Sequence, residues 1–262
     1  MSRWGLRIAT ALGFAFLYIP IGVIVLYAFN AQRVQAWPIQ SYSLEWFQAA
    51  LDNESVRGAL LLSLEVAVGA TVVALLLGSL AAFAVQRFRF FGRETVSFAL
   101  VLPIALPGIV TGMALNSSIN ATGIGFSTLT IVIGHATFCI VVVYNNVIAR
   151  LRRSSRTMEE ASMDLGADTW QTFRHITFPV IRSALVAGAL LAFALSFDEI
   201  IVTTFTAGTE QTLPIWILSN LSRPNQRPIV NVVAVALIVL SAAPVYVASR
   251  LSGSTGVGGS RT

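Results

Sequence analysis

Long apolar runs are the feature that most constrains how this chain can fold. The first extends from Ile8 to Phe29 without a single charged side chain. Stretches of about 18 or more apolar residues indicate helices that cross a membrane. The 262 residues are 55% hydrophobic and only 11% charged, whereas soluble domains carry about 25% charged residues. Because an isolated segment in lipid must pair its own backbone groups, the sequence predicts an all-α membrane protein.

Six such runs divide the chain, and we predict six transmembrane helices within one membrane domain, residues 1–262. No small-x-small cleavage site follows the first run, so we interpret it as a retained span rather than a signal peptide. Pro103 and Pro107 lie inside the third span, and Gly108 and Gly112 there are expected only to allow close helix contact. The predicted spans are 8–29, 58–85, 95–115, 127–149, 179–205 and 229–249.

The distribution of basic residues predicts the orientation. All 17 basic residues are arginines. If both termini are cytoplasmic, only four of them lie outside, which agrees with the excess of positive charge in cytoplasmic loops. Residues 150–178 are then a cytoplasmic loop, and we expect the small, polar tail, 253–262, to be flexible. The four outer arginines are Arg33, Arg57, Arg223 and Arg227.

The same composition excludes several kinds of site. Without lysine the chain has neither a phosphate-binding P-loop nor a lysine Schiff base. Its one cysteine, Cys139, allows no internal disulfide and no multi-cysteine metal site. The positive charges are spread over short loops, which argues against nucleic-acid binding. We therefore predict no catalytic residue, no metal and no cofactor.

The loop 150–178 is an amphipathic, charged interruption in an apolar chain. Thr157 and Glu160 have the spacing of a capping box that begins a helix. Met158, Ala161 and Leu165 form one apolar stripe on that helix. Gly166 follows where a left-handed residue ends a helix. The first half of the loop is therefore predicted to be a short helix with a glycine stop.

A second helix is predicted after the glycine. Asp168 and Gln171 form another capping pair, an apolar set of Trp170, Phe173 and Ile176 follows, and Pro179 suits the first turn of the next span. Such a segment can lie on the lipid surface or dock into a groove of another protein. The charges between Glu159 and Asp168 are all acidic, which disfavours an anionic lipid surface.

Residues Glu160-Ala161-Ser162, then Gly166, then Ile176-Thr177-Phe178-Pro179, resemble the EAA loop of the permease subunits of binding-protein-dependent ABC importers. The family spacing is intact, with Ser162 in place of an alanine and Phe178 in place of a leucine. The resemblance implies a coupling helix that docks into a cleft on a cytoplasmic ATPase. The implied coupling residues are Glu159, Glu160, Ala161, Ser162, Asp164, Leu165, Gly166, Ile176 and Pro179.

The resemblance covers most of the chain, and residues 17–30, 100–115, 134–151 and 195–208 are similar to the spermidine/putrescine branch of these permeases. It implies a type I importer permease in the cytoplasmic membrane that moves polyamines by alternating access. The implied partners are an ABC ATPase dimer, a second and non-identical permease, and an extracytoplasmic substrate-binding protein. A permease for another small cation or solute is the alternative.

Three acidic residues are expected within the spans. Asp198 and Glu199 lie about 28–30 Å along the fifth span from Pro179, and Glu65 lies at a comparable depth in the second. Acids inside a membrane are costly and typical of ion or substrate paths, so these three are candidate substrate-path residues. On a helix Asp198 and Glu199 point about 100° apart. The alternative is that they end the span and accept hydrogen bonds from loop amides.

Two further functions fit parts of the pattern. An ion-coupled secondary transporter would use Asp198 and Glu199 as proton or cation sites, although no inverted repeat is evident. An intramembrane enzyme has only His135 with Asp198 to support it. We expect His135 in the fourth span to be satisfied by a neighbouring carbonyl rather than to relay protons.

Overall fold

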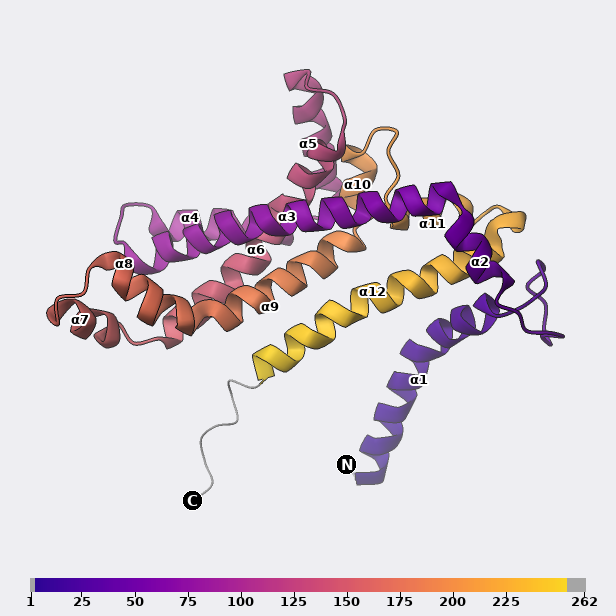
Figure 1. Ribbon diagram of the computed structural model, residues 1–262, viewed down its shortest axis with the longest axis horizontal. Helices are drawn as coiled ribbons and strands as arrows, with labels where there is room; N and C mark the ends of the chain where they lie inside the picture. Colours follow the sequence, from indigo (N-terminus) through magenta and orange to yellow (C-terminus); the bar gives the residue numbers. More distant parts are fainter. Residues whose placement is uncertain (1–2, 254–262) are drawn as a thin grey trace. The chain divides into compact units, whose positions relative to one another are not determined.

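The computed structural model describes residues 3–253, with side chains as far as residue 250, and this part of the chain is almost entirely helical (Figure 1). Of the predicted tail, everything from residue 254 onward lies outside the described residues. The elements are α1 (Arg3–Ala28), α2 (Glu45–Asp52), α3 (Glu54–Arg87), α4 (Arg93–Ala105), α5 (Gly108–Thr122), α6 (Thr128–Arg153), α7 (Thr157–Asp164), α8 (Thr169–Thr172), the π-helical turn η1 (Phe173–Thr177), α9 (Phe178–Phe197), α10 (Ile201–Thr206), α11 (Leu213–Asn220), the 3₁₀ turn η2 (Pro224–Gln226) and α12 (Arg227–Gly253).

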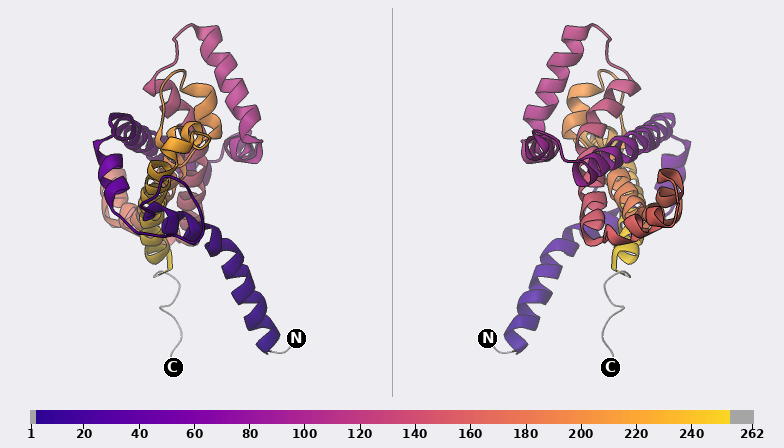
Figure 2. Two further views of the ribbon diagram at one scale, coloured as in Figure 1. Left: turned by 90° about the vertical axis from the view of Figure 1, so that its right-hand side faces the viewer. Right: turned by 90° about the vertical axis from the view of Figure 1, so that its left-hand side faces the viewer.

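Within the described residues, five helical segments are long and apolar enough to cross a membrane. They are Arg3–Ala28, Glu54–Arg87, Thr128–Arg153, Thr169–Phe197 and Pro224–Arg250. The helices α4 and α5 pass the same test only when they are taken together (Figure 2). They are bent by 104° relative to each other, so they form either one broken span, which would be the sixth crossing, or a re-entrant loop. The six predicted apolar runs therefore correspond to five spans and one bent pair.

The third predicted span, 95–115, is wrong as a continuous helix. Leu106, which precedes Pro107, has an extended backbone with ψ of 147°. Proline sterically disfavours the helical conformation of the residue before it, so the chain turns there instead of continuing. The polar residues from Asn116 onward lie beyond the predicted span and are nevertheless helical. α5 continues to Thr122, and the Asn116 side chain donates to the Phe205 carbonyl at 2.7 Å.

The described chain separates into two compact units, residues 62–253 without 213–240, and residues 3–61 with 213–240. In the first, α6 is the central helix and packs between α3 and α9. Gly78 of α3 allows this contact, because a Cβ there would lie 2.8 Å from the Ile140 carbonyl oxygen of α6. On the other side, a Cβ on Gly188 of α9 would lie 3.4 Å from Val143 Cα, so α9 also packs closely on α6. Tyr144 is buried, and its hydroxyl lies 2.7 Å from Ser97 Oγ of α4.

The α5–α10 contact in this unit confirms the packing role predicted for Gly108 and Gly112. Gly108 faces Ile201, and a Cβ on Gly112 would overlap the Phe205 ring. The absence of side chains at these two positions lets the helices approach closely. The short helix α10 is thereby held against α5.

In the other unit, the segment after α1 folds around Trp46. The indole Nε1 donates to the Asn30 carbonyl at 2.9 Å, and the Arg33 guanidinium lies 5.8 Å from the ring centroid. Trp46 is 7% exposed, so it is a core residue of this unit rather than part of an interfacial aromatic belt. Trp37 and Tyr42 of the same stretch are exposed, as expected for interfacial residues.

Candidate functional site

The coupling segment, residues 150–178, has the predicted helix, glycine and helix in that order (Figure 1). Gly166 has φ of +91°, in the region that side chains disfavour and glycine adopts freely. Its amide donates to the Met163 carbonyl at 2.9 Å, and the Ala167 amide donates to the Ser162 carbonyl at 3.1 Å. These bonds satisfy the last carbonyls of α7, so the predicted glycine stop is confirmed.

One of the two predicted capping pairs forms. The Gln171 amide donates to Asp168 Oδ1 at 2.8 Å, and the Asp168 amide donates to Gln171 Oε1 at 3.0 Å. The Thr157–Glu160 pair is wrong, because α7 is capped at Arg156 and the Thr157 amide donates to Ser155 Oγ at 3.2 Å. Ser155 Oγ thus accepts from the amide that the pattern assigned to the Glu160 carboxylate, and the Glu160 amide donates to the Arg156 carbonyl at 3.0 Å.

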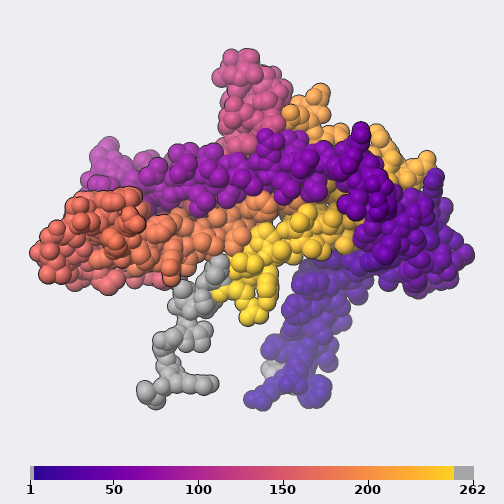
Figure 3. Space-filling model, in the orientation of Figure 1, coloured from indigo at the N-terminus to yellow at the C-terminus, as the bar shows by residue number. Residues whose placement is uncertain are grey.

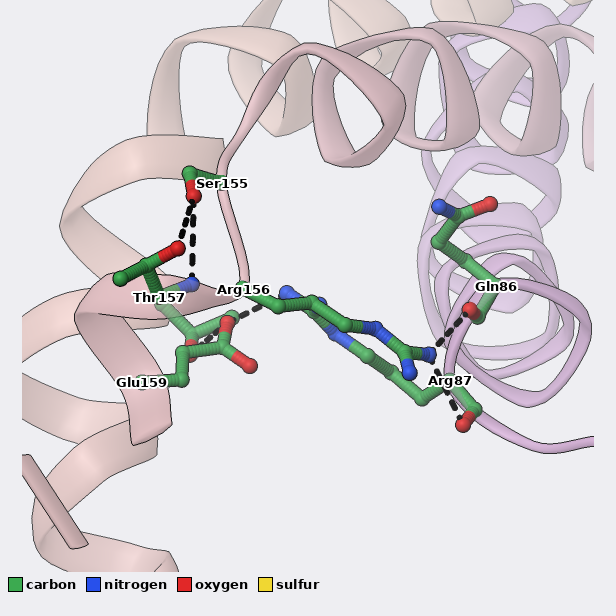
Figure 4. Close-up of polar contacts among 7 residues, drawn as sticks. Gln86, Arg87, Ser155, Arg156, Thr157 and Glu159 are labelled. Carbon is green, nitrogen blue, oxygen red and sulfur yellow. Dashed lines mark hydrogen bonds and ion pairs between the residues drawn. The ribbon is translucent and has the colours of Figure 1, made fainter. Parts of the chain in front are cut away.

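Four side chains, which we call the clamp, tie the coupling segment to the end of α3: Arg87, Arg156, Glu159 and Thr177. The Glu159 carboxylate pairs with the Arg87 guanidinium and accepts a hydrogen bond from Thr177 Oγ1 at 2.8 Å. Arg156 Nη2 donates to the carbonyls of Gln86 and Arg87 at 2.8 and 3.0 Å (Figure 4). Arg156 therefore caps the C-terminus of α3, where a cation is favourable.

The clamp places the first of the two coupling-segment glutamates in a structural contact. Arg87 and Glu159 are each 15% exposed, so their ion pair is shielded from solvent. Glu160, the glutamate of the EAA-like motif, faces solvent instead. Sequence reasoning identified Glu159 but missed Arg87 and Arg156, because no local spacing links residues about 70 positions apart.

The remaining surface of the coupling segment is apolar and acidic. Met158 is 52%, Met163 47%, Leu165 90% and Trp170 65% exposed, and no residue of α7 is buried. The segment forms the surface at one end of its unit in the space-filling view (Figure 3). The carboxylates of Glu160, Asp164 and Asp168 are also exposed, and none has an ion-pair partner within the described residues. Such a surface fits a groove that is apolar with a basic margin.

The second helix of the coupling segment continues directly into the fifth span. The π-helical turn Phe173–Thr177 joins α8 to α9, so Thr169–Phe197 is one helical rod. The Phe173 ring packs against Trp170 at 5.7 Å, Phe83 at 5.9 Å and Phe178 at 6.1 Å between centroids. Phe173 and Ile176 are half-buried, whereas Trp170 projects outward. The second half of the coupling segment and α9 are therefore joined by continuous helix and not by a loop.

The acidic pair lies at a break between α9 and α10, and the predicted continuous span 179–205 is wrong there. Asp198 and Glu199 have no helical geometry, so the expected 100° separation on a helix does not apply. Glu199 Oε1 accepts a hydrogen bond from the Val202 amide at 3.0 Å and caps α10. This is the alternative that the sequence left open for the pair. The Asp198 side chain is exposed, as is Glu65 on α3.

His135 fixes the same break from α6. Its Nδ1 lies 2.8 Å from Ser196 Oγ and its Nε2 lies 2.8 Å from Thr203 Oγ1. The Thr203 hydroxyl donates its one proton to the Glu199 carbonyl at 2.8 Å, so Nε2 is the donor to Thr203 and Nδ1 accepts from Ser196. Neighbouring groups therefore satisfy the ring, as the sequence predicts, and two hydroxyl groups are among its partners.

Comparison with known proteins places these features in a family. The family model described as "Binding-protein-dependent transport system inner membrane component" matches residues 74–252. The chain belongs to this family. The permease therefore resides in the inner membrane and is a transport component rather than an enzyme, and the resemblance drawn from residues 159–179 is confirmed at the level of the family.

Individual relatives are similar over nearly the full length. The putrescine transport system permease protein PotI of Escherichia coli (strain K12) is 36% identical over 250 residues, which cover 92% of this chain and 87% of PotI. The spermidine/putrescine transport system permease protein PotC of Haemophilus influenzae is 33% identical over 255 residues, 96% of this chain and 98% of PotC. A putative 2-aminoethylphosphonate transport system permease protein, PhnV of Salmonella paratyphi A, is 29% identical and covers 83% of each chain.

Solved structures support the fold. A chain of a bacterial ABC transporter involved in the import of the acidic polysaccharide alginate matches with a TM-score of 0.70 at 18% identity, covering 95% of this permease and 98% of that chain. A chain of a bacterial alginate ABC transporter in complex with alginate pentasaccharide-bound periplasmic protein matches with a TM-score of 0.66 at 15% identity, covering 98% of this permease and 96% of that chain. The permease has the type I importer fold.

Proposed function

We propose that this permease is the membrane subunit of an ATP-driven importer that moves polyamines, spermidine or putrescine, into the cytoplasm. The observation that carries the proposal is the similarity at 33–36% identity, over more than nine-tenths of this chain, to permeases named for these two substrates. The chain itself performs no chemistry. Binding and hydrolysis of ATP by a separate ATPase dimer drive the alternation between outward and inward access.

The coupling segment is the proposed docking site of that ATPase. Its exposed Met158, Met163, Leu165 and Trp170 supply apolar area, and the surrounding carboxylates favour a basic margin on the partner. The clamp and the helical rod then transmit the partner's motion to α3 and α9. The coupling residues proposed from the sequence keep this role, with Glu159 acting from inside the clamp rather than at the docking surface.

A second permease and an extracytoplasmic substrate-binding protein complete the proposed importer. The binding protein delivers substrate to the outer side, where Asp198 and Glu65 expose carboxylates that attract an ammonium group. Glu199 contributes charge at the same break although one of its oxygens caps α10. We keep these three acids as the proposed substrate-path residues.

The experiment that tests the function is uptake into vesicles that contain the reconstituted importer. Labelled spermidine and putrescine are expected to accumulate only when ATP and the binding protein are both present. Collapse of ion gradients by ionophores is expected to leave uptake unchanged, whereas an ion-coupled secondary transporter would lose it. Uptake without ATP would refute the proposal.

Another amine substrate is the second candidate, because the PhnV relative is named for 2-aminoethylphosphonate, which carries one ammonium group. A competition assay separates the two. Unlabelled 2-aminoethylphosphonate is expected to leave spermidine uptake unchanged, because a site that binds a polycation with carboxylates repels the anionic phosphonate group. Strong competition by that compound would favour the second candidate.

A further inference from the structure

A polar groove runs between the ends of α6 and α9 that lie nearest the coupling segment. It encloses about 340 Å³ and is lined by two asparagines, two arginines and a serine among three alanines. The full lining is Asn145, Asn146, Ala149, Arg150, Arg153, Ser183, Ala184 and Ala187. Asn145, Ala149 and Arg153 follow one another at intervals of four and share one face of α6, so the polar groups form a stripe.

The stripe extends well into the membrane. Arg153 is the last residue of α6, and Asn145 lies about 12 Å further along the helix at 1.5 Å per residue. Arginines at a helix end lie near the lipid headgroups and leave the preceding turns in the hydrocarbon region. Asn145 also lies within the predicted span 127–149, so an amide there that faced lipid would find few hydrogen-bond partners.

The Asn145 side chain is exposed, and it has no hydrogen-bond partner among the described residues. An unsatisfied polar group costs several kcal/mol in the hydrocarbon region. Asn146 differs, since its Nδ2 donates one hydrogen bond to the Val142 carbonyl at 2.9 Å, which leaves its oxygen and its second N–H to pair with other groups. Exposing these two amides to lipid would cost free energy, because lipid forms no hydrogen bonds with them, whereas water would satisfy them. This face of α6 is therefore unfavourable as a lipid-facing surface.

Small alanine side chains keep the groove open, and two arginines lie at its end nearest the coupling segment. Ala149, Ala184 and Ala187 leave space that longer side chains would fill. Arg150 Nε donates to the Val180 carbonyl at 2.9 Å and fixes the start of α9 beside α6. The guanidinium of Arg153 is exposed at the mouth without an ion-pair partner within the described part of the chain.

We infer that this groove is a wall of the water-filled cytoplasmic half of the translocation pathway, and that the amide oxygens of Asn145 and Asn146 accept hydrogen bonds from the ammonium groups of the passing substrate. The inference rests on the proposed function. Amide oxygens replace part of the hydration of an ammonium ion without a full negative charge. Arg150 and Arg153 repel a polycation at the mouth, so the groove guides and releases the substrate and does not retain it.

Thiol accessibility tests the inference. The background is Cys139→Ala, because Cys139 is the single cysteine and is buried. Asn145→Cys is compared with Leu80→Cys, an exposed apolar position about 10 Å from the end of α3. Inside-out vesicles that contain the whole importer are treated with a charged, membrane-impermeant methanethiosulfonate reagent. Because only a hydrated thiol ionises and reacts, Asn145→Cys is expected to react about tenfold faster than Leu80→Cys or more.

Two further measurements identify what faces the groove. In the first, spermidine is added, and it is expected to slow modification of the cysteine in Asn145→Cys. In the second, the importer is arrested with ATP and vanadate, which is also expected to slow that modification. Equal rates for the two cysteine variants would overturn the inference, as would a rate that neither treatment changes. Reactivity in the isolated permease that disappears in the assembled importer would instead assign the groove to the interface with the second permease.

A bulky side chain gives an independent test. Ala149→Phe is expected to abolish most spermidine uptake while ATP hydrolysis stimulated by the binding protein continues, and Leu80→Phe is expected to leave both unchanged. Normal uptake by Ala149→Phe would overturn the inference. Failure of the wild-type importer to take up either polyamine refutes the proposed function itself, whereas normal uptake with an unreactive Asn145→Cys refutes only the pathway wall.

Discussion

Replacing Arg87 by methionine removes one of the two cations of the clamp, the one that pairs with Glu159, and keeps an unbranched side chain. The substitution leaves the Glu159 carboxylate with the Thr177 hydroxyl as its one remaining partner in the described part of the chain. Arg156 still caps the end of α3 through the carbonyls of residues 86 and 87. The change therefore tests the ion pair without removing the other contact between the coupling segment and α3.

The burial of the pair sets the expected magnitude. Exposed pairs contribute about 0.2–1 kcal/mol, and removing one partner of a fully buried pair costs about 3–5 kcal/mol. With both side chains 15% exposed, we expect a loss of about 2 kcal/mol, between these limits and within the range for charged hydrogen bonds. That is about a 30-fold increase in the population in which the coupling segment is detached from α3.

The assay is the ratio of spermidine imported to ATP hydrolysed by the reconstituted importer. Arg87→Met is expected to lower this ratio, because motion of the ATPase then reaches α3 less often. Arg89→Met is the matched control, since Arg89 lies two residues beyond Arg87 in the loop that follows α3, is exposed and has no ion-pair partner within the described residues. Equal ratios for the two variants would refute the assigned role of the clamp.

A double-mutant cycle with Glu159→Gln separates the pair from its individual members. If the two side chains act as a unit, the double variant is no worse than either single variant, and the coupling energy between them is about 1–2 kcal/mol. Additive losses would mean that Arg87 and Glu159 act through different contacts.

Three other substitutions are predicted from the same geometry. Gly166→Ala is expected to weaken co-purification of the ATPase, because a left-handed residue with a Cβ costs about 1–2 kcal/mol; unchanged recovery of the ATPase would contradict this. Asp198→Asn is expected to raise the spermidine concentration needed for half-maximal uptake while assembly stays normal, and unaltered kinetics would remove Asp198 from the substrate path. His135→Leu leaves the hydroxyls of Ser196 and Thr203 without the ring and is expected to lower thermal stability, with His135→Gln retaining more of it; equal melting temperatures for both variants and the wild type would contradict the hydrogen-bonded role.

The sequence predicts where the apolar runs and the helices of the coupling segment lie, because both depend on local patterns, but it misses the breaks within 95–115 and 179–205. A long apolar run needs no partner to be recognised, and the glycine stop at Gly166 follows from backbone sterics. The Asp168–Gln171 cap is local for the same reason. The Thr157–Glu160 cap failed although its pattern was equally good, since Ser155 competes for the same backbone amide.

The remaining features depend on contacts between residues far apart in the sequence, or on single residues whose effect is lost when hydropathy is averaged over a window. The bend at Leu106 was foreseeable from Pro107, but an apolar window averages over it. The clamp joins Arg87 to Glu159, which are 72 residues apart in the sequence, and no local sequence pattern predicts that pair. The polar stripe of α6 was also missed, because one continuous apolar average conceals an asparagine pair followed by arginines.

The uninterrupted rod Thr169–Phe197 fixes how small displacements scale along the permease. Its 29 residues extend about 43 Å at 1.5 Å per residue. If the end near Gly166 is held and the rod tilts by about 5°, the end beside Asp198 moves by about 4 Å, which exceeds the length of a hydrogen bond. A rotation too small to disturb side-chain packing near Gly166 would thus be enough to change the hydrogen-bond partners of Asp198 and Glu199 at the far end of the rod.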